Sequence, residues 1–249
     1  MRKYGLIGYP LEHSFSKKYF AEKFRNEGIE DASYDNYPLK SLKEFEKLIK
    51  EEKELSGLNV TIPYKQEVIP FLDSVDTEAS EVGAVNVIKI YRNGDKIVLK
   101  GYNTDIYGFR ESLKPFLNRK ISHALVLGTG GSSKAVAYVL GQLSIKVIFV
   151  SRIKKPECIT YEDINEEVID TTMLIVNTTP VGMYPLTDNK PDIPYHLLSP
   201  SHILYDLIYN PEQTLFLKEG LRRGCTIING LEMLRLQAEK SWEIWNNPD

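Results

Sequence analysis

The sequence predicts an α/β protein with mostly parallel β-sheet, and three observations support this fold class. Strand-like and helix-like segments alternate along the chain, which is typical of β–α–β units. A composition of 42% hydrophobic and 26% charged residues is that of a globular protein with a sizeable core. The 249 residues suffice for one large domain or two ordinary ones.

Composition and charge also exclude several classes. The net charge is −3 and the Lys and Arg residues are interspersed with acids, so nucleic-acid binding is not expected. Cys158 and Cys225 lie far apart without metal-ligand spacing, which disfavours a disulfide framework or a metal site and fits a reducing cytoplasm. No apolar run approaches the ~18 residues of a membrane helix. We therefore expect a cytoplasmic protein without metal, membrane or nucleic-acid partners.

The first part of the chain predicts alternating strands and helices. They are a strand at Tyr4–Ile7, a loop at Gly8–Phe15, a helix near Lys17–Asn26, a strand at Tyr34–Tyr37 and a helix at 41–53. In NVTIPYK the apolar alternation of Leu58, Val60 and Ile62 predicts a short strand that Pro63 ends. Lys65 follows, and taken alone it is typical of a solvated surface lysine.

A β-hairpin is predicted in VNVIKIYRNGDKIVLKGYNTD, because Asn93-Gly94 is suited to a tight turn between two strands. With these two residues at the turn centre, Asn86 pairs with Gly101, and Asp105 lies about four residues beyond, roughly 13 Å along the strand. The hairpin therefore brings Asn86 and residues 103–105 to the same end of a sheet.

A second α/β unit follows the hairpin. Its expected elements are a helix near Tyr107–Leu117, a strand at His123–Leu127, a glycine loop at 128–131, a helix at Ser133–Leu143, a strand at Ile145–Val150, further strands at Met173–Val176, Ile203–Leu207 and Thr226–Ile228, and a last helix at Leu231–Trp245. In that last helix, Leu234, Ala238, Trp242 and Trp245 form the expected buried stripe.

The stretch HALVLGTGGSSKAVAYVL places glycines between a strand and a helix, where backbone N–H groups can hold a pyrophosphate. Ser133 occupies the third glycine position, so a tight turn without a ligand remains the alternative. The next strand ends in VSRIKK, with cations where an NAD site has an acid, and this pattern predicts NADP. A basic loop in solvent would explain one cation but not the missing acid.

Motifs along nearly the whole chain resemble the shikimate dehydrogenase family. They are GYPLEHSFSKKYF, NVTIPYK, EVGAVNVI, GYNTDIYGF, LGTGGSSKA, NTTPVGM, YDLIYNPEQTLFL and NGLEMLRLQAEKSWEIW. The resemblance implies NADPH-dependent, reversible reduction of 3-dehydroshikimate to shikimate, on the route to chorismate and the aromatic amino acids. It also implies two α/β domains with a cleft between them. A substrate-binding domain is expected at 1–106, joined by the C-terminal helix at 231–249, and a Rossmann-like NADP-binding domain at 107–230.

By this resemblance Lys65 is the catalytic acid/base and Asp105 is its partner. A ketone that accepts a hydride develops an alkoxide, and a lysine ammonium supplies the proton and stabilising positive charge. Asp105 can orient that ammonium and keep it charged. Pro63 stiffens the approach, so that Lys65 is held at the edge of a sheet.

The resemblance implies two sets of binding residues. For a carboxylated ring with several hydroxyls, they are Ser14, Ser16, Asn59, Thr61, Asn86, Tyr209 and Gln237. For NADP, they are Gly128, Thr129, Gly130, Gly131, Ser132, Ser151, Arg152, Lys155, Leu207 and Gly230, with Thr178 and Thr179 expected to line the same cleft. Without the resemblance, Ser16 would be a plain helix N-cap. For Gln237, a satisfied structural glutamine is the alternative.

The chain departs from the family pattern in two places. Ser132 and Lys134 stand where Ala and Arg are common, and Ser-Arg-Ile-Lys-Lys replaces Asn-Arg-Thr with a later Arg, for which Lys155 is the candidate. A quinate/shikimate dehydrogenase of relaxed substrate or NAD use is the alternative, which an acid after Arg152 would have favoured; Ile153 is there instead. A cofactor-binding sensor would be favoured by loss of the catalytic pair, which is present. We expect a monomer or a homodimer.

Overall fold

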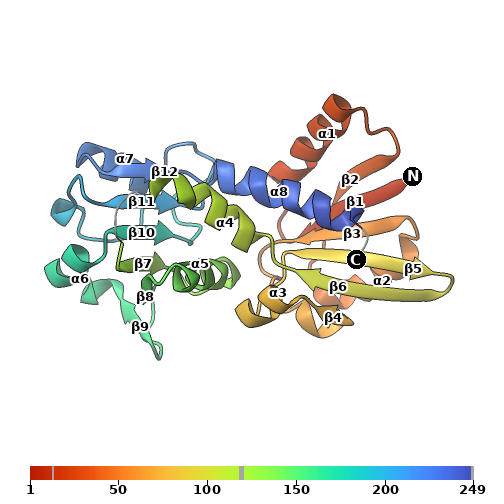
Figure 1. Cartoon of the computed structure of the whole chain (residues 1–249), viewed down its shortest axis with the longest axis horizontal. Helices are drawn as coiled ribbons and strands as arrows, with labels where there is room; N and C mark the ends of the chain where they lie inside the picture. Colours follow the sequence, from red (N-terminus) through yellow and green to blue (C-terminus); the bar gives the residue numbers. More distant parts are fainter. Residues whose placement is uncertain (13, 118–120, 248–249) are drawn as a thin grey trace. The chain divides into compact units, whose positions relative to one another are not determined.

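The computed structural model describes residues 1–12, 14–117 and 121–247. The chain divides into two compact units, which we call the first unit (Met1–Thr104 with Ala238–Asp249) and the second unit (Asp105–Gln237). Each unit contains a β-sheet with helices, which confirms the α/β fold class (Figure 1). His13, which belongs to the motif GYPLEHSFSKKYF, lies outside the described residues.

The sheet of the first unit is mixed, with strand order β2-β1-β3-β5-β6-β4. The strands are β1 (Arg2–Gly8), β2 (Ala32–Pro38), β3 (Leu55–Val60), β4 (Ser74–Val75), β5 (Val87–Asn93) and β6 (Lys96–Tyr102), and the helices are α1 (Phe15–Glu27), α2 (Phe45–Glu51) and α3 (Thr77–Val82), with 3₁₀ turns at Leu42–Glu44 and Ile69–Phe71. β1 runs parallel to β2 and β3, whereas β5 runs antiparallel to β3 and β6.

The β5–β6 hairpin forms, but its register differs from the predicted one. Ile88, and not Asn86, pairs with Gly101, and Asn93 pairs with Lys96. The two turn residues are therefore Gly94 and Asp95. Gly94 has a φ of 59°, and glycine at the first central position favours a two-residue hairpin turn. The shift places Asn86 nearer to residues 103–105 than predicted.

β3 is also shorter than predicted. It ends at Val60, and Ile62 is 61% exposed instead of continuing the apolar face. The reason is a turn: the Tyr64 amide donates to the Thr61 carbonyl at 2.9 Å, and Pro63 has no N–H to give to a neighbouring strand.

Side chains of β1 alternate between two cores, as the pleat of a strand requires. Tyr4 and Leu6 pack with α1 and with the C-terminal part of the last helix, α8 (Leu231–Asn246). Ile7 points to the opposite face and packs with α2 and α3. Trp245 of α8 lies so close to the sheet that a Cβ on Gly57 would be 2.4 Å from its ring, and its indole N–H donates to the Ile88 carbonyl at 3.1 Å.

The sheet of the second unit is parallel, with strand order β12-β11-β10-β7-β8-β9. The strands are β7 (His123–Leu127), β8 (Lys146–Ser151), β9 (Cys158–Thr160), β10 (Leu174–Asn177), β11 (Ile203–Asp206) and β12 (Thr226–Ile228), and the helices are α4 (Asp105–Leu113), α5 (Gly131–Gln142), α6 (Glu166–Thr171), α7 (Leu215–Arg222) and the start of α8, with 3₁₀ turns at Lys114–Phe116, Tyr161–Asp163 and Tyr195–Leu197. The chain leaves β7 toward β8 and β9, then returns to build β10, β11 and β12 on the other side.

The core of the second unit lies on both faces of its sheet. Leu125 and Leu127 of β7 pack with residues of α6 and α7. Phe109 of α4 contacts Tyr205 of β11 edge to face, with ring centroids 5.0 Å apart, and α4 also packs against α5. These layers leave the carboxyl ends of the strands at one edge of the sheet.

The buried stripe of α8 differs in part from the prediction. Ala238 and Trp245 are buried as expected, but Leu234 and Trp242 are only half-buried. Ser241 takes a buried position on the same face with no exposed surface. A polar residue at that position indicates hydrogen bonding in place of apolar packing.

Candidate active site

The order of strands in the second unit creates a switch point between β7 and β10, where the chain direction across the sheet reverses. In open α/β sheets, ligands bind outside the carboxyl ends of strands at such a point. The end of β7 leads into the glycine loop, and the end of β10 leads into Thr178 and Thr179. The Thr178 amide and hydroxyl both donate to the Leu127 carbonyl, at 3.0 and 2.7 Å, and hold the two strand ends together.

The glycine loop has the geometry of a phosphate cradle. Gly128 has a φ of 112°, and a Cβ there would lie 2.7 Å from Thr178 Oγ1, so only glycine fits. At Gly130, the N-cap of α5, an added Cβ would meet no described atom within 4 Å, so the loop is open on that side. The first N–H groups of α5 have no partners within the helix and favour an anion.

Ser133 explains how the loop works without a third glycine. Its hydroxyl donates to the Gly130 carbonyl at 2.6 Å, and the residue is 1% exposed. The side chain thus turns back into the loop and leaves the helix N-terminus open.

The residues after β8 place positive charge beside the glycine loop. Lys155 Nζ donates to Thr129 Oγ1 at 2.9 Å, and the Gly128 amide donates to the Val150 carbonyl at 2.9 Å. Arg152 is exposed. Burial raises the pKa of Tyr161, and the nearby charge of Arg152 offsets part of that rise. The last residue of β8 is Ser151, which is buried and has no carboxylate. A ligand here would meet cations where an NAD site has a carboxylate.

Leu207 and Gly230 are brought together at the ends of β11 and β12. The Gly230 amide donates to the Ile208 carbonyl at 3.0 Å, and a Cβ on Gly230 would lie 2.0 Å from the Leu207 carbonyl oxygen. The Leu207 amide donates in turn to the Asn177 carbonyl at 3.0 Å. The predicted cofactor residues therefore lie along one edge of the sheet, and this edge fits a dinucleotide with a 2′-phosphate.

In the first unit, Thr61 and Lys65 follow the end of β3. The Thr61 amide donates to the Ile7 carbonyl at 2.9 Å. Lys65 is half-buried in the following turn, and its carbonyl accepts from the Val85 amide at 2.7 Å. The backbone of Lys65 is thus fixed next to the residue that precedes Asn86.

A buried polar network joins Asn59 and Asn86, two of the predicted substrate residues. Asn59 Oδ1 accepts from the Tyr34 hydroxyl at 2.8 Å, and its Nδ2 donates to Ser241 Oγ at 3.0 Å. Asn86 Nδ2 donates to Thr104 Oγ1 at 3.1 Å, and Asn86 Oδ1 accepts from the Thr104 amide at 2.7 Å. These bonds confirm that the hairpin brings Asn86 and Thr104 to the same end of the sheet.

Two further contacts extend this network. The hydroxyls of Thr104 and Ser241 lie 3.3 Å apart, which connects the Asn86 and Asn59 pairs. Burial raises the pKa of Tyr34, and a hydrogen bond with Ser16 offsets part of that rise. The network therefore runs from α1 through the sheet to α8.

The N-cap of α1 is not Ser16, which was the alternative role considered for that residue. Ser14, and not Ser16, is the N-cap, and its side chain makes no capping bond. The Ser14 hydroxyl oxygen is buried without a hydrogen-bond partner among the described residues. Because an unpaired buried hydroxyl is costly, its position favours a ligand that is polar.

In the second unit, Asp105 is the first residue of α4 and is 4% exposed. Gly108, three residues later, lies on the same face of α4. That face packs tightly on α8, since a Cβ on Gly108 would lie 2.6 Å from the Met233 carbonyl and 3.1 Å from Gln237 Cβ. Gln237 therefore lies against the face of α4 that carries Asp105. Tyr209 is half-buried in the loop after β11.

Comparison with known proteins identifies the family of this chain. Residues 6–88 match the family described as the shikimate dehydrogenase substrate binding domain. The shikimate dehydrogenase (NADP(+)) of Methanococcus aeolicus is 38% identical over 261 residues, which cover 97% of this chain and 90% of the relative. This chain belongs to the shikimate dehydrogenase family.

Solved structures of the shikimate dehydrogenase family have the same fold. The crystal structure from Aquifex aeolicus has a TM-score of 0.86 and 36% identity, and covers 99% of this chain and 92% of that chain. The enzyme from Thermus thermophilus, in complex with NADP(H) and shikimate, has a TM-score of 0.85 and 30% identity, and covers 100% and 95%.

Sequence reasoning missed several residues that hold the predicted site residues. Tyr34 and Ser241 bond to Asn59. Asn177 bonds to Leu207, a predicted cofactor residue, and Asp206 bonds to Asn177. Ser241 could have been found from its place on the buried face of α8. Tyr34 and Asp206 have no local signal, because their partners are distant in sequence or in the following loop.

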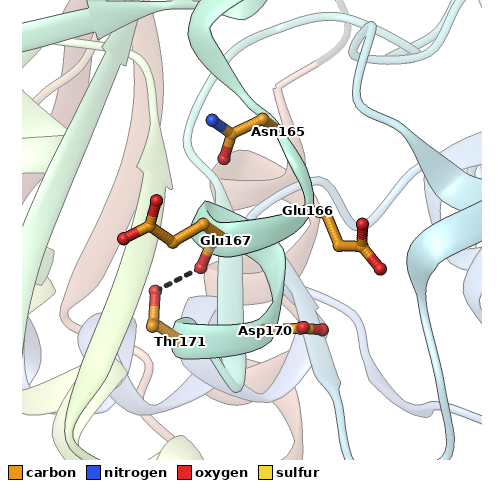
Figure 2. A pocket seen from close by; sticks show the side chains of 5 residues that line it. All are labelled: Asn165, Glu166, Glu167, Asp170 and Thr171. Atoms are coloured by element: carbon orange, nitrogen blue, oxygen red, sulfur yellow. Dashed lines mark hydrogen bonds between the residues drawn. The ribbon is translucent and has the colours of Figure 1, made fainter.

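One surface hollow, shown in Figure 2, contains none of the predicted site residues. It is lined by Asn165, Glu166, Glu167, Asp170 and Thr171 of α6 and its cap. The Thr171 hydroxyl donates to the Glu167 carbonyl at 2.9 Å, and Glu166 and Asp170 point to the same side. Its acidic lining would repel a carboxylate or phosphate ligand.

Within the described residues, no helix combines the length and apolar character needed to cross a membrane. The same residues contain no group of three or more His, Cys, Asp and Glu side chains that could hold a metal ion.

Proposed function

We propose that this protein catalyses the reversible, NADP-dependent conversion of shikimate to 3-dehydroshikimate, on the route to chorismate. The observation that carries the cofactor assignment is the hydrogen bond from Lys155 to Thr129, which places a cation over an open glycine loop. The relatives that share this chain's family are named as NADP(+) enzymes, which supports both substrate and cofactor.

The proposed division of labour is close to that of the two units, whose boundaries lie after Thr104 and after Gln237. Residues 1–106, with the helix at 231–249, bind substrate, and residues 107–230 bind NADP. The family match over residues 6–88, described as a substrate binding domain, supports the first assignment. The switch point between β7 and β10 supports the second.

We propose that Lys65 is the acid/base of the reaction. Bound NADP would supply the acceptor for the hydride that leaves the carbon bearing the reacting hydroxyl. In that direction the neutral amine of Lys65 takes the hydroxyl proton, and in reduction the ammonium of Lys65 returns a proton to the developing alkoxide. The anchored backbone of Lys65 limits where its side chain can reach, and we propose Asp105 as the partner that orients it.

The remaining roles follow from the hydrogen-bonding capacity of each group. Ser14 and Ser16 donate to the substrate carboxylate near the start of α1, where the helix N-terminus favours negative charge. Thr61, Asn86, Tyr209 and Gln237 contact ring hydroxyls or the carboxylate. Both side-chain amide atoms of Asn59, and both of Asn86, already bond within the protein, so we assign these two residues to hold the network as well as to face the substrate.

Compartment and assembly are part of the proposal. Both cysteines are free, and Cys225 is buried, which fits a reducing cytoplasm. We propose a monomer or a homodimer with no nucleic-acid partner.

The test is an absorbance assay at the band of reduced nicotinamide, with shikimate or quinate as substrate and NADP or NAD as cofactor. We expect the highest kcat/KM for shikimate with NADP. Equal rates with quinate or NAD would instead identify the relaxed quinate/shikimate enzyme. No nicotinamide reduction in any combination would refute a dehydrogenase.

A further inference from the structure

Asp206 is a buried carboxylate to which the proposed chemistry assigns no role. It is the last residue of β11 and has no exposed surface. Its Oδ1 accepts from the Ile208 amide at 3.1 Å and from Asn177 Nδ2 at 3.0 Å. Its Oδ2 accepts from the Thr214 hydroxyl at 2.6 Å. One side chain therefore joins β10, the loop after β11 and the start of α7.

All of these partners are neutral. A carboxylate that is buried among neutral donors costs stability compared with one that is paired with a cation. Three donors converge on it nonetheless, and only an acceptor with two oxygens can receive all three in this geometry. The buried carboxylate therefore fixes the positions of its three donors at the end of β11, at a cost in the free energy of folding.

The groups bonded to Asp206 are one hydrogen bond away from the predicted cofactor residues. Asn177 Oδ1 accepts from the Thr179 amide at 3.1 Å and from its hydroxyl at 2.7 Å. The Asn177 carbonyl accepts from Leu207, and the Ile208 carbonyl accepts from Gly230. Thr179, Leu207 and Gly230 are thus fixed through Asp206.

The strand order indicates which half of the cofactor these residues meet. Arg152 and Lys155 follow β8, on one side of β7, and suit the adenosine end with its 2′-phosphate. The pyrophosphate belongs at the start of α5, next to β7. β10 and β11 lie on the opposite side of β7, so a dinucleotide that crosses the switch point places its nicotinamide half there.

We propose that Asp206 is a positioning residue for the nicotinamide half of the NADP site. Resting on the proposed function, this inference says that its carboxylate ties the loop at 207–214 to Asn177 and so holds Leu207, Thr179 and Gly230 in place. Asp206 itself contacts no ligand, and it acts through the backbone and side chains that it binds.

Isothermal titration of two ligands separates the halves of the site. NADP uses both halves, whereas adenosine 2′,5′-bisphosphate uses only the adenosine half. Asp206→Ala removes the acceptor of all three donors and should weaken NADP about tenfold. The affinity for the bisphosphate should stay within about twofold of that of the unsubstituted protein, because the glycine loop and Arg152 are unchanged. Asp206→Asn should recover most of the NADP affinity, since Thr214 can turn to accept from the new amide.

Two further variants keep the test decisive if Asp206→Ala does not fold. Thr214→Val preserves shape but removes one donor to Asp206 and the N-cap acceptor of the Leu217 amide. It should weaken NADP binding about threefold without affecting binding of the bisphosphate. Thr172→Val is the matched control, because Thr172 is also fully buried but its hydroxyl donates to Val168 on α6. It should lower the melting temperature and leave both affinities unchanged.

The outcomes are distinct. A lower melting temperature with unchanged NADP affinity in Asp206→Ala and Thr214→Val would show that Asp206 is only structural. Equal weakening of NADP and the bisphosphate would also overturn the proposal, because it assigns Asp206 to one half. Failure of the proposed function itself would show in the unsubstituted protein, as absence of shikimate-dependent reduction of NADP.

Discussion

Replacing Asp206 with asparagine should change how the free energy of unfolding depends on pH. Burial raises the pKa of Asp206 from 3.8 to about 6, although hydrogen bonds from Thr214, Ile208 and Asn177 oppose the rise. Burial raises the pKa of Tyr195, and the charges of Glu219 and then Asp206 add to that rise. Because the folded protein holds this proton more tightly than the unfolded chain, Asp206 stabilises the fold below about pH 4 and loses that contribution as the pH rises through about 6.

The magnitude follows from the shift. A rise from 3.8 to about 6 is about 2 pKa units, and each unit corresponds to about 1.4 kcal/mol. The unfolding free energy of the unsubstituted protein, minus that of Asp206→Asn, should therefore fall by about 3 kcal/mol between about pH 4 and pH 7. Urea denaturation followed by circular dichroism measures this difference. Tryptophan fluorescence would not, because Trp242 and Trp245 belong to the first unit.

Asp163→Asn is the matched control with the opposite sign. Hydrogen bonds from Thr160 lower the pKa of Asp163, so its contribution is present above its ordinary pKa and is lost as the pH falls. The corresponding difference should therefore rise with pH. If the Asp206 difference is flat, or rises as the Asp163 difference does, the carboxylate of Asp206 is not held in an apolar environment and the reasoning fails.

Three predictions concern the proposed chemistry. Lys65→Ala should lower turnover by about 10²–10⁴-fold, or about 3–5 kcal/mol of barrier, with much less effect on substrate binding in steady-state kinetics; turnover within a few-fold of the parent would make Lys65 a solvated surface lysine. Gln237→Ala, which keeps the Cβ near Gly108, should weaken shikimate binding by about 1–3 kcal/mol in isothermal titration and leave NADP affinity nearly unchanged. A lower melting temperature with unchanged shikimate affinity would show a structural glutamine. Arg152→Asp should lower the NADP-to-NAD ratio of kcat/KM, because attraction to the 2′-phosphate becomes repulsion; an unchanged ratio would place the basic segment in solvent.

Elements with strong local patterns were predicted closely from the sequence. β7 begins at His123 and ends at Leu127 as predicted, and β12 spans Thr226 to Ile228. Short elements were missed, such as β9 at Cys158–Thr160, which exists through its pairing with β8. Three residues carry too little periodicity to be recognised, because their conformation depends on a neighbouring strand.

Register and strand ends were predicted less well than the strands themselves. The hairpin was recognised from Asn93 and Gly94, yet its turn lies one residue later because Gly94 takes the first central position. The strand before Lys65 was extended to Ile62, although it ends at Val60. In both cases the residue types allowed more than one arrangement, and packing of the sheet selected one.

The sequence by itself determined the alternation of strands and helices, the glycine loop, the cations after β8 and the family, because these depend on residue types over a few positions. Only the tertiary structure decided which polar side chains meet. Asn59 and Ser241 are 182 residues apart yet bond at 3.0 Å, and Asp206 of β11 bonds Asn177 at the end of β10. Such contacts arise when strands and helices pack, and a buried polar group takes whichever partner the packed core brings within reach.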